Sequence, residues 1–454
     1  MKLAVIGGGG VRSMFLAKTL AQKAKEINIT KLVFMDDNPE KLSIYGKMAE
    51  QVVKQIDSQI DFSLTLDPAE AVTDADYVIT TIRVGGDDKR VQDERIALDM
   101  GVLGQETTGA AGFSFAMRSV PALIGYCELI RKYSKPTVKV FNFTNPAGLV
   151  SQCLRDLGYS FTFGICDAPS GLIRQCAALY NVPVENVTAD CYGLNHLSFF
   201  DKFCVNGKNI LPELLQNPRL YTETEMCYFE PELANKLGCL INEYLYYYLY
   251  REQSLRNVLT SKQIRSELIK QVNRSMTEEL SQISIENEFL KALKIFEKWY
   301  DVRESAYMQS ETGKGRNKSA FTFDVDSTDV GGYAGVALDY IKAEQTGKSV
   351  DMILCVPNEG SIVGLEPNDT VEITCTITGD GYVPHKVENP GELQMEYIKR
   401  VKYYERTAAK AIIKHSKDAA VDALTMHPLV NSYSLAKGLV DRYTEINKDY
   451  FSFS

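Results

Sequence analysis

The chain has 454 residues, of which 45% are hydrophobic and 24% are charged, and its formal net charge is −9. A chain of this length can bury a large core and form two or three domains. The acidic balance argues against nucleic acid and against an anionic membrane as the main partner. It leaves room for an anionic small molecule held by a local cluster of arginines.

The compartment is predicted from the N-terminus and the cysteines. No apolar run approaches the ~20 residues that a membrane span needs, and the apolar run in MKLAVIGGGG is about five residues, too short for a signal peptide. Ten cysteines are scattered along the chain without a CxxC pair. We therefore expect a cytoplasmic protein with reduced thiols and no membrane partner.

Apolar, β-prone segments alternate with helical stretches in the first part of the chain. We expect strands at 3–6, 31–35, 76–81, 137–143, 161–165 and 187–192. This alternation predicts a doubly wound parallel sheet, the Rossmann-like fold of lactate and malate dehydrogenases. Residues 1–195 are predicted to form an NAD-binding domain. Residues 196–454, helical around an extended stretch at 350–386, are predicted to form an α+β substrate and oligomerisation domain.

A glycine turn follows the first strand, which is the arrangement that brings backbone N–H groups to a pyrophosphate. The second strand ends in Asp36, placed to bind a ribose diol and to repel a 2′-phosphate, so NAD is preferred over NADP. The alternatives are a purely structural turn and a site for another nucleotide. The predicted cofactor residues are Gly7, Gly8, Gly9, Gly10 and Asp36. Arg12, which follows, can face the cofactor, a substrate anion or solvent.

Polar side chains follow three later β-prone segments. They are Asn145, Cys166 with Asp167, and His196. The carboxyl ends of parallel strands share one edge, so we expect these residues to share one rim. Cys166 and His196 can be a metal pair, a nucleophile with its base, or a buried thiol and a core histidine.

Two arginines, Arg83 and Arg90, follow the third predicted strand, and they start at the same edge. Arginines there can hold an anionic sugar or a phosphate through paired hydrogen bonds. Ordinary surface charge is the alternative.

Together these segments resemble the family-4 glycoside hydrolases, which depend on NAD and a divalent metal. The resemblance extends over nearly the whole chain and rests on VIGGGG, RVGG, LGQETTGAAG, NFTNPAG, GICDAP, GLNHLSF and EYLYYYL. It implies Cys166 and His196 as ligands of a catalytic metal, usually Mn²⁺, and Tyr244 as the proton-abstracting base. It also implies substrate binding by Asn145, Arg90 and Arg265. A phosphorylated glucoside or disaccharide is the implied substrate, and a homodimer or homotetramer the implied assembly.

The family mechanism, as the resemblance implies it, is redox elimination. NAD⁺ oxidises C3, Tyr244 removes the C2 proton, the C1 substituent leaves, water adds, and NADH reduces C3 again.

Two departures from the family pattern bear on specificity. The glycine turn continues as Val11-Arg12-Ser13-Met14, and the residue after the metal-ligand cysteine is Asp167. In the family, Asn at the latter place accompanies 6-phospho-β-glucosidases, whereas Asp in a CDMP context serves 6-phospho-α-glucosidases as a general acid. The flanking motifs look closer to the β group. We predict a 6-phospho-β-glucosidase, with a 6-phospho-α-glucosidase as the alternative and an NAD-dependent 2-hydroxy-acid dehydrogenase as a remoter one.

Overall fold

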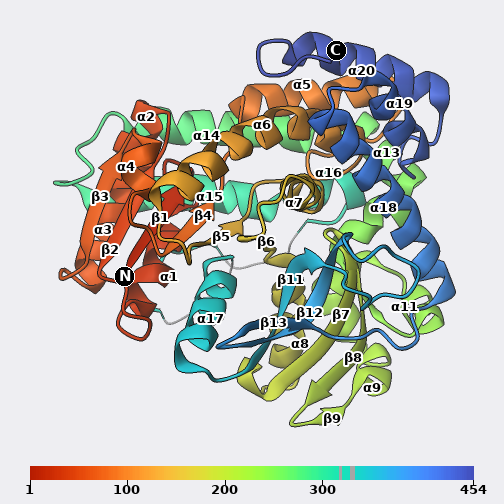
Figure 1. Ribbon diagram of the computed structural model, residues 1–454, viewed down its shortest axis with the longest axis horizontal. Coiled ribbons are helices and arrows are strands. Elements are labelled where there is room, and N and C mark those ends of the chain that lie inside the picture. The colour runs from red at the N-terminus through yellow and green to blue at the C-terminus, as the bar shows by residue number, and fades with distance from the viewer. Residues whose placement is uncertain (316–319, 328–332, 454) are drawn as a thin grey trace.

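The computed structural model describes residues 1–315, 320–327 and 333–453. Within these residues, nine strands form one sheet in the order β13-β12-β11-β6-β5-β4-β1-β2-β3 (Figure 1). The parallel strands are β1 Lys2–Ile6, β2 Lys31–Met35, β3 Asp61–Thr65, β4 Tyr77–Thr80, β5 Lys139–Asn142 and β6 Thr162–Gly164. Their order, 3-2-1-4-5-6, is that of the Rossmann fold, which confirms the predicted fold class. Strand β3 was not among the expected strands.

Helices pack in two groups against this sheet, as expected of a doubly wound fold. One group is α1 Ser13–Lys23, α3 Lys47–Ile56 and α17 Tyr333–Thr346, and the other is α4 Pro68–Val72, α6 Gly109–Tyr133 and α7 Ala147–Asp156. The central strands are buried because both faces are covered, and this explains why their sequences are continuous apolar runs.

The extended stretch of the second half joins the same sheet. Strands β11 Val350–Pro357, β12 Thr370–Thr378 and β13 Gly381–Pro384 add antiparallel beyond β6. The two halves of the chain therefore share one sheet.

A second, antiparallel sheet packs against β12. It consists of β7 Val187–Leu194, β8 Leu197–Val205, β9 Lys208–Asn209 and β10 Leu240–Ile241. The expectation that the strand before His196 ends at the rim of the parallel sheet is wrong, because residues 195–196 are the two-residue turn of the β7–β8 hairpin. The predicted domain division also falls in this turn, and it stays a prediction.

The remaining helices surround these sheets. Helices α14 Arg265–Leu280 and α15 Phe289–Ser305 pack side by side as a hairpin (Figure 1), with α14 against α5 Gly86–Asp99 and α15 against α3. The others are α2 Pro39–Lys41, α5 Gly86–Asp99, α8 Ala168–Leu179, α9 Leu211–Leu215, α10 Leu220–Glu223, α11 Pro231–Leu237, α12 Tyr246–Leu249, α13 Arg251–Thr260, α16 Gln309–Thr312, α18 Glu392–Ile413, α19 Lys417–Met426 and α20 Tyr433–Asn447. Short turns of other helix types, η1 Leu42–Gly46, η2 Val184–Asn186, η3 Glu225–Tyr228 and η4 Glu243–Leu245, complete the chain. Among the described helices, none is both long and apolar enough to cross a bilayer.

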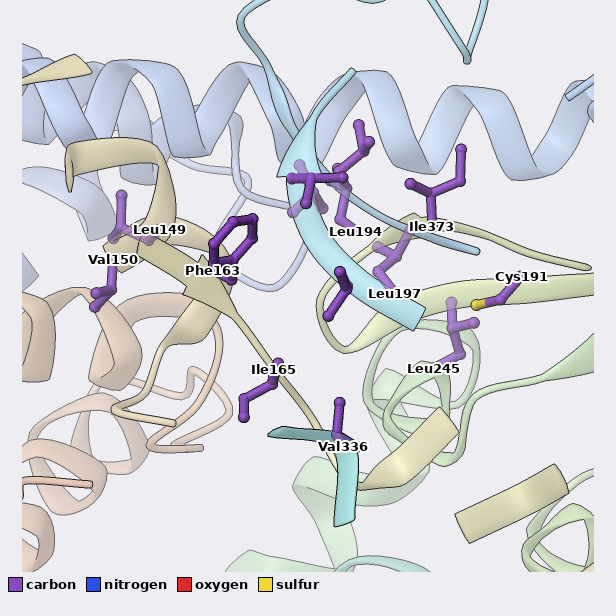
Figure 2. Close-up of a cluster of buried hydrophobic side chains, with 14 of the residues drawn as sticks. Leu149, Val150, Phe163, Ile165, Cys191, Leu194, Leu197, Leu245, Val336 and Ile373 are labelled. Carbon is purple, nitrogen blue, oxygen red and sulfur yellow. The ribbon is translucent and has the colours of Figure 1, made fainter. Parts of the chain in front are cut away.

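A buried apolar cluster joins the two sheets. Figure 2 shows Ile165, Leu194, Leu197 and Ile373 in this cluster, and each is at most 1% exposed. Ile165 directly precedes Cys166, and the two leucines flank the turn that carries His196. The core thus fixes the backbone on both sides of the predicted metal pair.

Candidate active site

A cavity of about 500 Å³ lies at the carboxyl ends of β1, β4, β5 and β6. Most of the residues predicted from the sequence line it, namely Gly7, Gly9, Gly10, Arg12, Arg83, Arg90, Asn145, Cys166, Asp167, His196, Tyr244 and Arg265. Gly8 and Asp36 do not contribute to its lining. Residues from both halves of the chain therefore converge where ligands bind in doubly wound folds.

The glycine turn packs tightly on its neighbours. Gly7 has φ +100°, and a Cβ there would lie 2.5 Å from the Thr81 carbonyl oxygen, so only glycine fits. The Gly9 N–H donates to Asp36 Oδ2 at 2.9 Å, and Asp36 Oδ1 accepts from the Asn38 N–H at 3.0 Å. Burial raises the pKa of Asp36. The carboxylate is thus fixed beside the turn, at the end of β2 where a ribose diol would bind.

Cys166 and His196, which the resemblance implies as metal ligands, lie side by side in the cavity. Their Sγ and Nε2 atoms are 3.7 Å apart, which compares with about 3.6 Å for a thiolate and an imidazole on one tetrahedral metal ion. Burial lowers the pKa of His196 to about 4, so its imidazole is neutral at pH 7 and free to bind a metal. Burial raises the pKa of the Cys166 thiol, and Glu372 and Asp167 raise it further. A divalent cation would have to displace that proton.

The pair leaves coordination positions open. In the part of the chain that the structure describes, no cluster of three or more His, Cys, Asp or Glu side chains is placed to hold a metal ion. Two protein ligands are typical neither of a closed structural site nor of a full catalytic set. The donors present therefore fit a metal that also binds a substrate or water.

Tyr244 lies against His196. Their rings stack with centroids 3.8 Å apart and an interplanar angle of 10°. Burial raises the pKa of Tyr244, and the nearby Glu243 and Cys166 raise it further. Proton abstraction by this phenol at neutral pH therefore needs added positive charge in the cavity.

Arg90 is enclosed by carboxylates. Its side chain is 8% exposed and lies 3.1 Å from Glu94 and 3.1 Å from Glu106. Glu106 also pairs with Arg83, which is more exposed. Burial raises the pKa of Glu94 to about 6, whereas Arg83 and Arg90 overcome burial and lower that of Glu106 to about 2. Direct substrate binding by Arg90 stays a prediction.

Arg303, at the end of α15, is a cavity residue that the sequence analysis did not find. The α14–α15 hairpin brings it to Arg265 at the start of α14, where the Arg265 guanidinium donates to the Arg303 carbonyl oxygen at 2.8 Å. Burial and the charge of Arg12 lower the pKa of Arg303 to about 10. Its buried Nε has no hydrogen-bond partner within the described residues. The charge of Arg265 lowers the pKa of Arg303 as well, and a cavity lined by Arg12, Arg265 and Arg303 can hold an anion.

Asp167 follows Cys166 and precedes α8. Its Oδ2 is 3.6 Å from the Arg12 Nη1, and both side chains are partly exposed in the cavity. The two departures from the family pattern thus face each other.

Comparison with known proteins places this geometry in a family. The model described as "Family 4 glycosyl hydrolase" matches residues 2–182, and that of the "Family 4 glycosyl hydrolase C-terminal domain" matches residues 191–430. The chain belongs to family 4 of the glycosyl hydrolases. The resemblance predicted from its motifs is therefore confirmed.

Family-4 relatives of both anomeric specificities match over the full length. The 6-phospho-β-glucosidase BglT of Thermotoga maritima is 31% identical, with 99% of each chain covered. The maltose-6′-phosphate glucosidase MalH of Clostridium acetobutylicum is 26% identical, with 98% of each chain covered.

Solved structures of family-4 enzymes also match over the whole chain. The Thermotoga maritima 6-phospho-β-glucosidase with manganese, NAD⁺ and glucose 6-phosphate has a TM-score of 0.82 at 28% identity, with 100% of both chains covered. A 6-phospho-α-glucosidase from gut microorganisms, in complex with NAD and Mn²⁺, has a TM-score of 0.81 at 25% identity, with 100% of this chain and 99% of that chain covered. The predicted cofactors, NAD and Mn²⁺, are thus those of solved relatives.

The dehydrogenase alternative loses its support. That reading needs a histidine paired with an aspartate beside the cofactor, whereas the Nε2 of His196 faces the Cys166 thiol and the pair of His385 with Asp190 is not part of the cavity lining.

Proposed function

We propose that the protein hydrolyses 6-phospho-β-glucosides by redox elimination, with NAD and a divalent metal, preferably Mn²⁺, as cofactors. The observation that carries the proposal is the Cys166–His196 pair with Tyr244 stacked on the imidazole, in one cavity with the glycine turn. A hydrolase that used two carboxylates alone would need neither a thiol–imidazole pair nor a dinucleotide turn.

In this mechanism each residue of the site has a separate role. When bound, NAD⁺ supplies a hydride acceptor for C3 of the sugar, and the metal supplies a Lewis acid for its oxygens. Cys166 and His196 hold the metal, and Asn145 orients the sugar hydroxyls. Tyr244 removes the C2 proton, which the C3 ketone has made acidic.

The 6-phosphate is assigned to the arginines. Arg265 and Arg303 line the cavity beside Arg12, and this grouping lowers the pKa of Arg303. A phosphate would pair with the buried guanidinium and offset the repulsion between like charges. The glucose 6-phosphate in the structure of the Thermotoga relative supports a phosphorylated sugar as the ligand.

A second candidate is a 6-phospho-α-glucosidase. Asp167 lines the cavity next to Cys166, where a carboxyl group can protonate a leaving oxygen. The β-specific relative has the higher identity of the two named above, 31% against 26%, which is why the β anomer is preferred.

The test is hydrolysis of 4-nitrophenyl α- and β-glucoside 6-phosphates, with the unphosphorylated glucosides as controls. We expect turnover of the β-linked phosphorylated substrate only with NAD⁺ and Mn²⁺ present, and no net NADH. Turnover of the α anomer alone would favour the second candidate, and turnover after removal of NAD and metal would refute the mechanism.

We also propose a homodimer or homotetramer, as the family resemblance implies. Light scattering coupled to size-exclusion chromatography tests this, and a single species at the monomer mass would refute it.

A further inference from the structure

A carboxylate outside the predicted site is buried behind it. Glu372 is the third residue of β12, is 1% exposed, and faces the second sheet. Burying a carboxyl group costs free energy unless hydrogen bonds compensate it. Its two oxygens accept bonds from Asn195 and Ser198, on either side of His196 in the β7–β8 hairpin, and these bonds link it to two segments of the site.

The first segment is the turn that carries His196. The Asn195 side-chain amide donates to Glu372 Oε1 at 3.0 Å. His196, the next residue, has φ +63°, a left-handed conformation that only a small share of non-glycine residues adopt. Such a conformation persists only where the surroundings fix it. The Asn195–Glu372 bond ties this turn to β12.

The second segment carries Tyr244. Ser198 Oγ donates to Glu372 Oε2 at 2.7 Å and accepts from the Asn242 side-chain amide at 3.1 Å. Asn242 Oδ1 in turn accepts from the Tyr244 backbone N–H at 3.0 Å, which caps the helical turn η4. Every donor in this series points toward the carboxylate. Ser198 and Asn242 are as buried as Glu372.

We propose that Glu372 is a positioning residue that fixes the metal ligand His196 and the base Tyr244 relative to each other through Asn195 and Ser198. The inference rests on the proposed function, because it assigns to the network the geometry of that site. Loss of a group that orients a metal ligand typically costs 10- to 100-fold in metal affinity or activity, about the effect expected here.

Three substitutions separate the two arms of the network. The His196 arm is the Asn195–Glu372 bond, and the Tyr244 arm runs from Glu372 through Ser198 and Asn242. Asn195→Ala removes the first arm, Ser198→Ala removes the second, and Glu372→Gln places an amide N–H₂ against one of the two donors. Thr374→Val is the matched control. Thr374 lies two residues along β12, is equally buried, and bridges to β7 through Cys191 and Ala189, away from the His196 turn.

Two readouts test the arms. The first is the affinity for Mn²⁺, followed by the electron paramagnetic resonance of free Mn²⁺ with glucose 6-phosphate present. The second is kcat with its isotope effect for a substrate deuterated at C2, since a misplaced Tyr244 makes proton abstraction more rate-limiting. Circular dichroism and thermal unfolding establish that each variant is folded.

For Asn195→Ala we expect an Mn²⁺ affinity about 10-fold or more below that of the unsubstituted protein. For Ser198→Ala we expect that affinity to hold while kcat falls and the isotope effect rises. Glu372→Gln should show both changes and Thr374→Val neither.

Wild-type Mn²⁺ affinity in both Asn195→Ala and Glu372→Gln would overturn the inference, as would an equal loss in Thr374→Val. Failure of the unsubstituted protein to bind Mn²⁺ or to hydrolyse any phosphoglucoside would instead refute the proposed function.

Discussion

Replacing Arg90 with methionine distinguishes a substrate-binding arginine from a structural one. The substitution keeps much of the side-chain length and removes the charge between Glu94 and Glu106. Both carboxylates are almost fully buried, so the change leaves them close together with one counter-ion, Arg83, on Glu106. We expect the dominant effect to be on stability.

The pKa of Glu106 gives the magnitude. Its lowering from 4.5 to about 2 corresponds to about 3 kcal/mol in favour of the ionised form. Arg83 and Arg90 share that stabilisation, while removing one partner of a buried pair costs about 3–5 kcal/mol. We therefore expect Arg90→Met to lower the free energy of unfolding by about 3 kcal/mol at about pH 8.

The loss in the free energy of unfolding should be smaller at acidic pH. Without Arg90, the pKa values of Glu94 and Glu106 in the folded protein rise. A carboxyl group with a raised folded pKa stabilises the protein when protonated, and this contribution disappears as the pH rises through that pKa. Since the pKa of Glu94 is already about 6, the destabilisation should be smaller at about pH 5 than at about pH 8.

Urea unfolding followed by circular dichroism at both pH values measures this difference. Arg95→Met, on the same helix α5, is the control, because Arg95 pairs with Glu267 at the surface and such a pair contributes about 1 kcal/mol at most. If Arg90→Met were as stable as Arg95→Met and its KM for the phosphorylated substrate rose strongly, Arg90 would be a direct ligand and the reasoning would be wrong.

Three further predictions concern single residues. Tyr244→Phe should lower kcat by about 10²- to 10⁴-fold while Mn²⁺ and NAD⁺ titrations stay unchanged; weakened cofactor binding would count against its role as base. Arg303→Met should raise KM for the 6-phospho-glucoside without weakening the binding of NAD⁺, and equal losses in both would argue against a phosphate site. The hydrogen bond to Asp190 raises the pKa of His385, so its stabilisation is present below the unfolded pKa of about 6.5 and is lost as the pH rises through the folded value. His385→Asn should thus destabilise the protein more at about pH 6 than at about pH 8.5, as thermal unfolding would measure; an equal loss at both would refute the linkage.

The sequence predicted the parallel sheet because its central strands are apolar runs between helices. It did not identify β3, whose residues Asp61 and Ser63 interrupt the apolar pattern at the sheet edge. It also missed β8 and with it the hairpin. A two-residue hairpin turn is normally signalled by glycine with asparagine or aspartate, and Asn195-His196 lacks the glycine. Because that turn was not recognised, His196 was assigned to the wrong sheet.

The site residues that follow strand ends were found, since their position in a doubly wound fold predicts where they point. Arg303 and Glu372 were not, and the reason is physical. Arg303 ends an amphipathic helix, where an arginine is expected on any solvated face. Glu372 alternates with Val371 and Ile373, a pattern typical of a strand with one wet face. A second sheet covers that face, so the polar side became the inside.

The two departures from the family pattern are brought together only by the fold. In the sequence, Arg12 and Asp167 are separate deviations, one in the glycine turn and one beside the metal pair. In the structure their charged groups are 3.6 Å apart across the cavity. An aspartate at this position adds negative charge where a phosphorylated substrate and a dinucleotide would bind, and a nearby guanidinium offsets it. The two positions therefore form one electrostatic unit, and any account of the anomeric preference has to treat Asp167 together with Arg12.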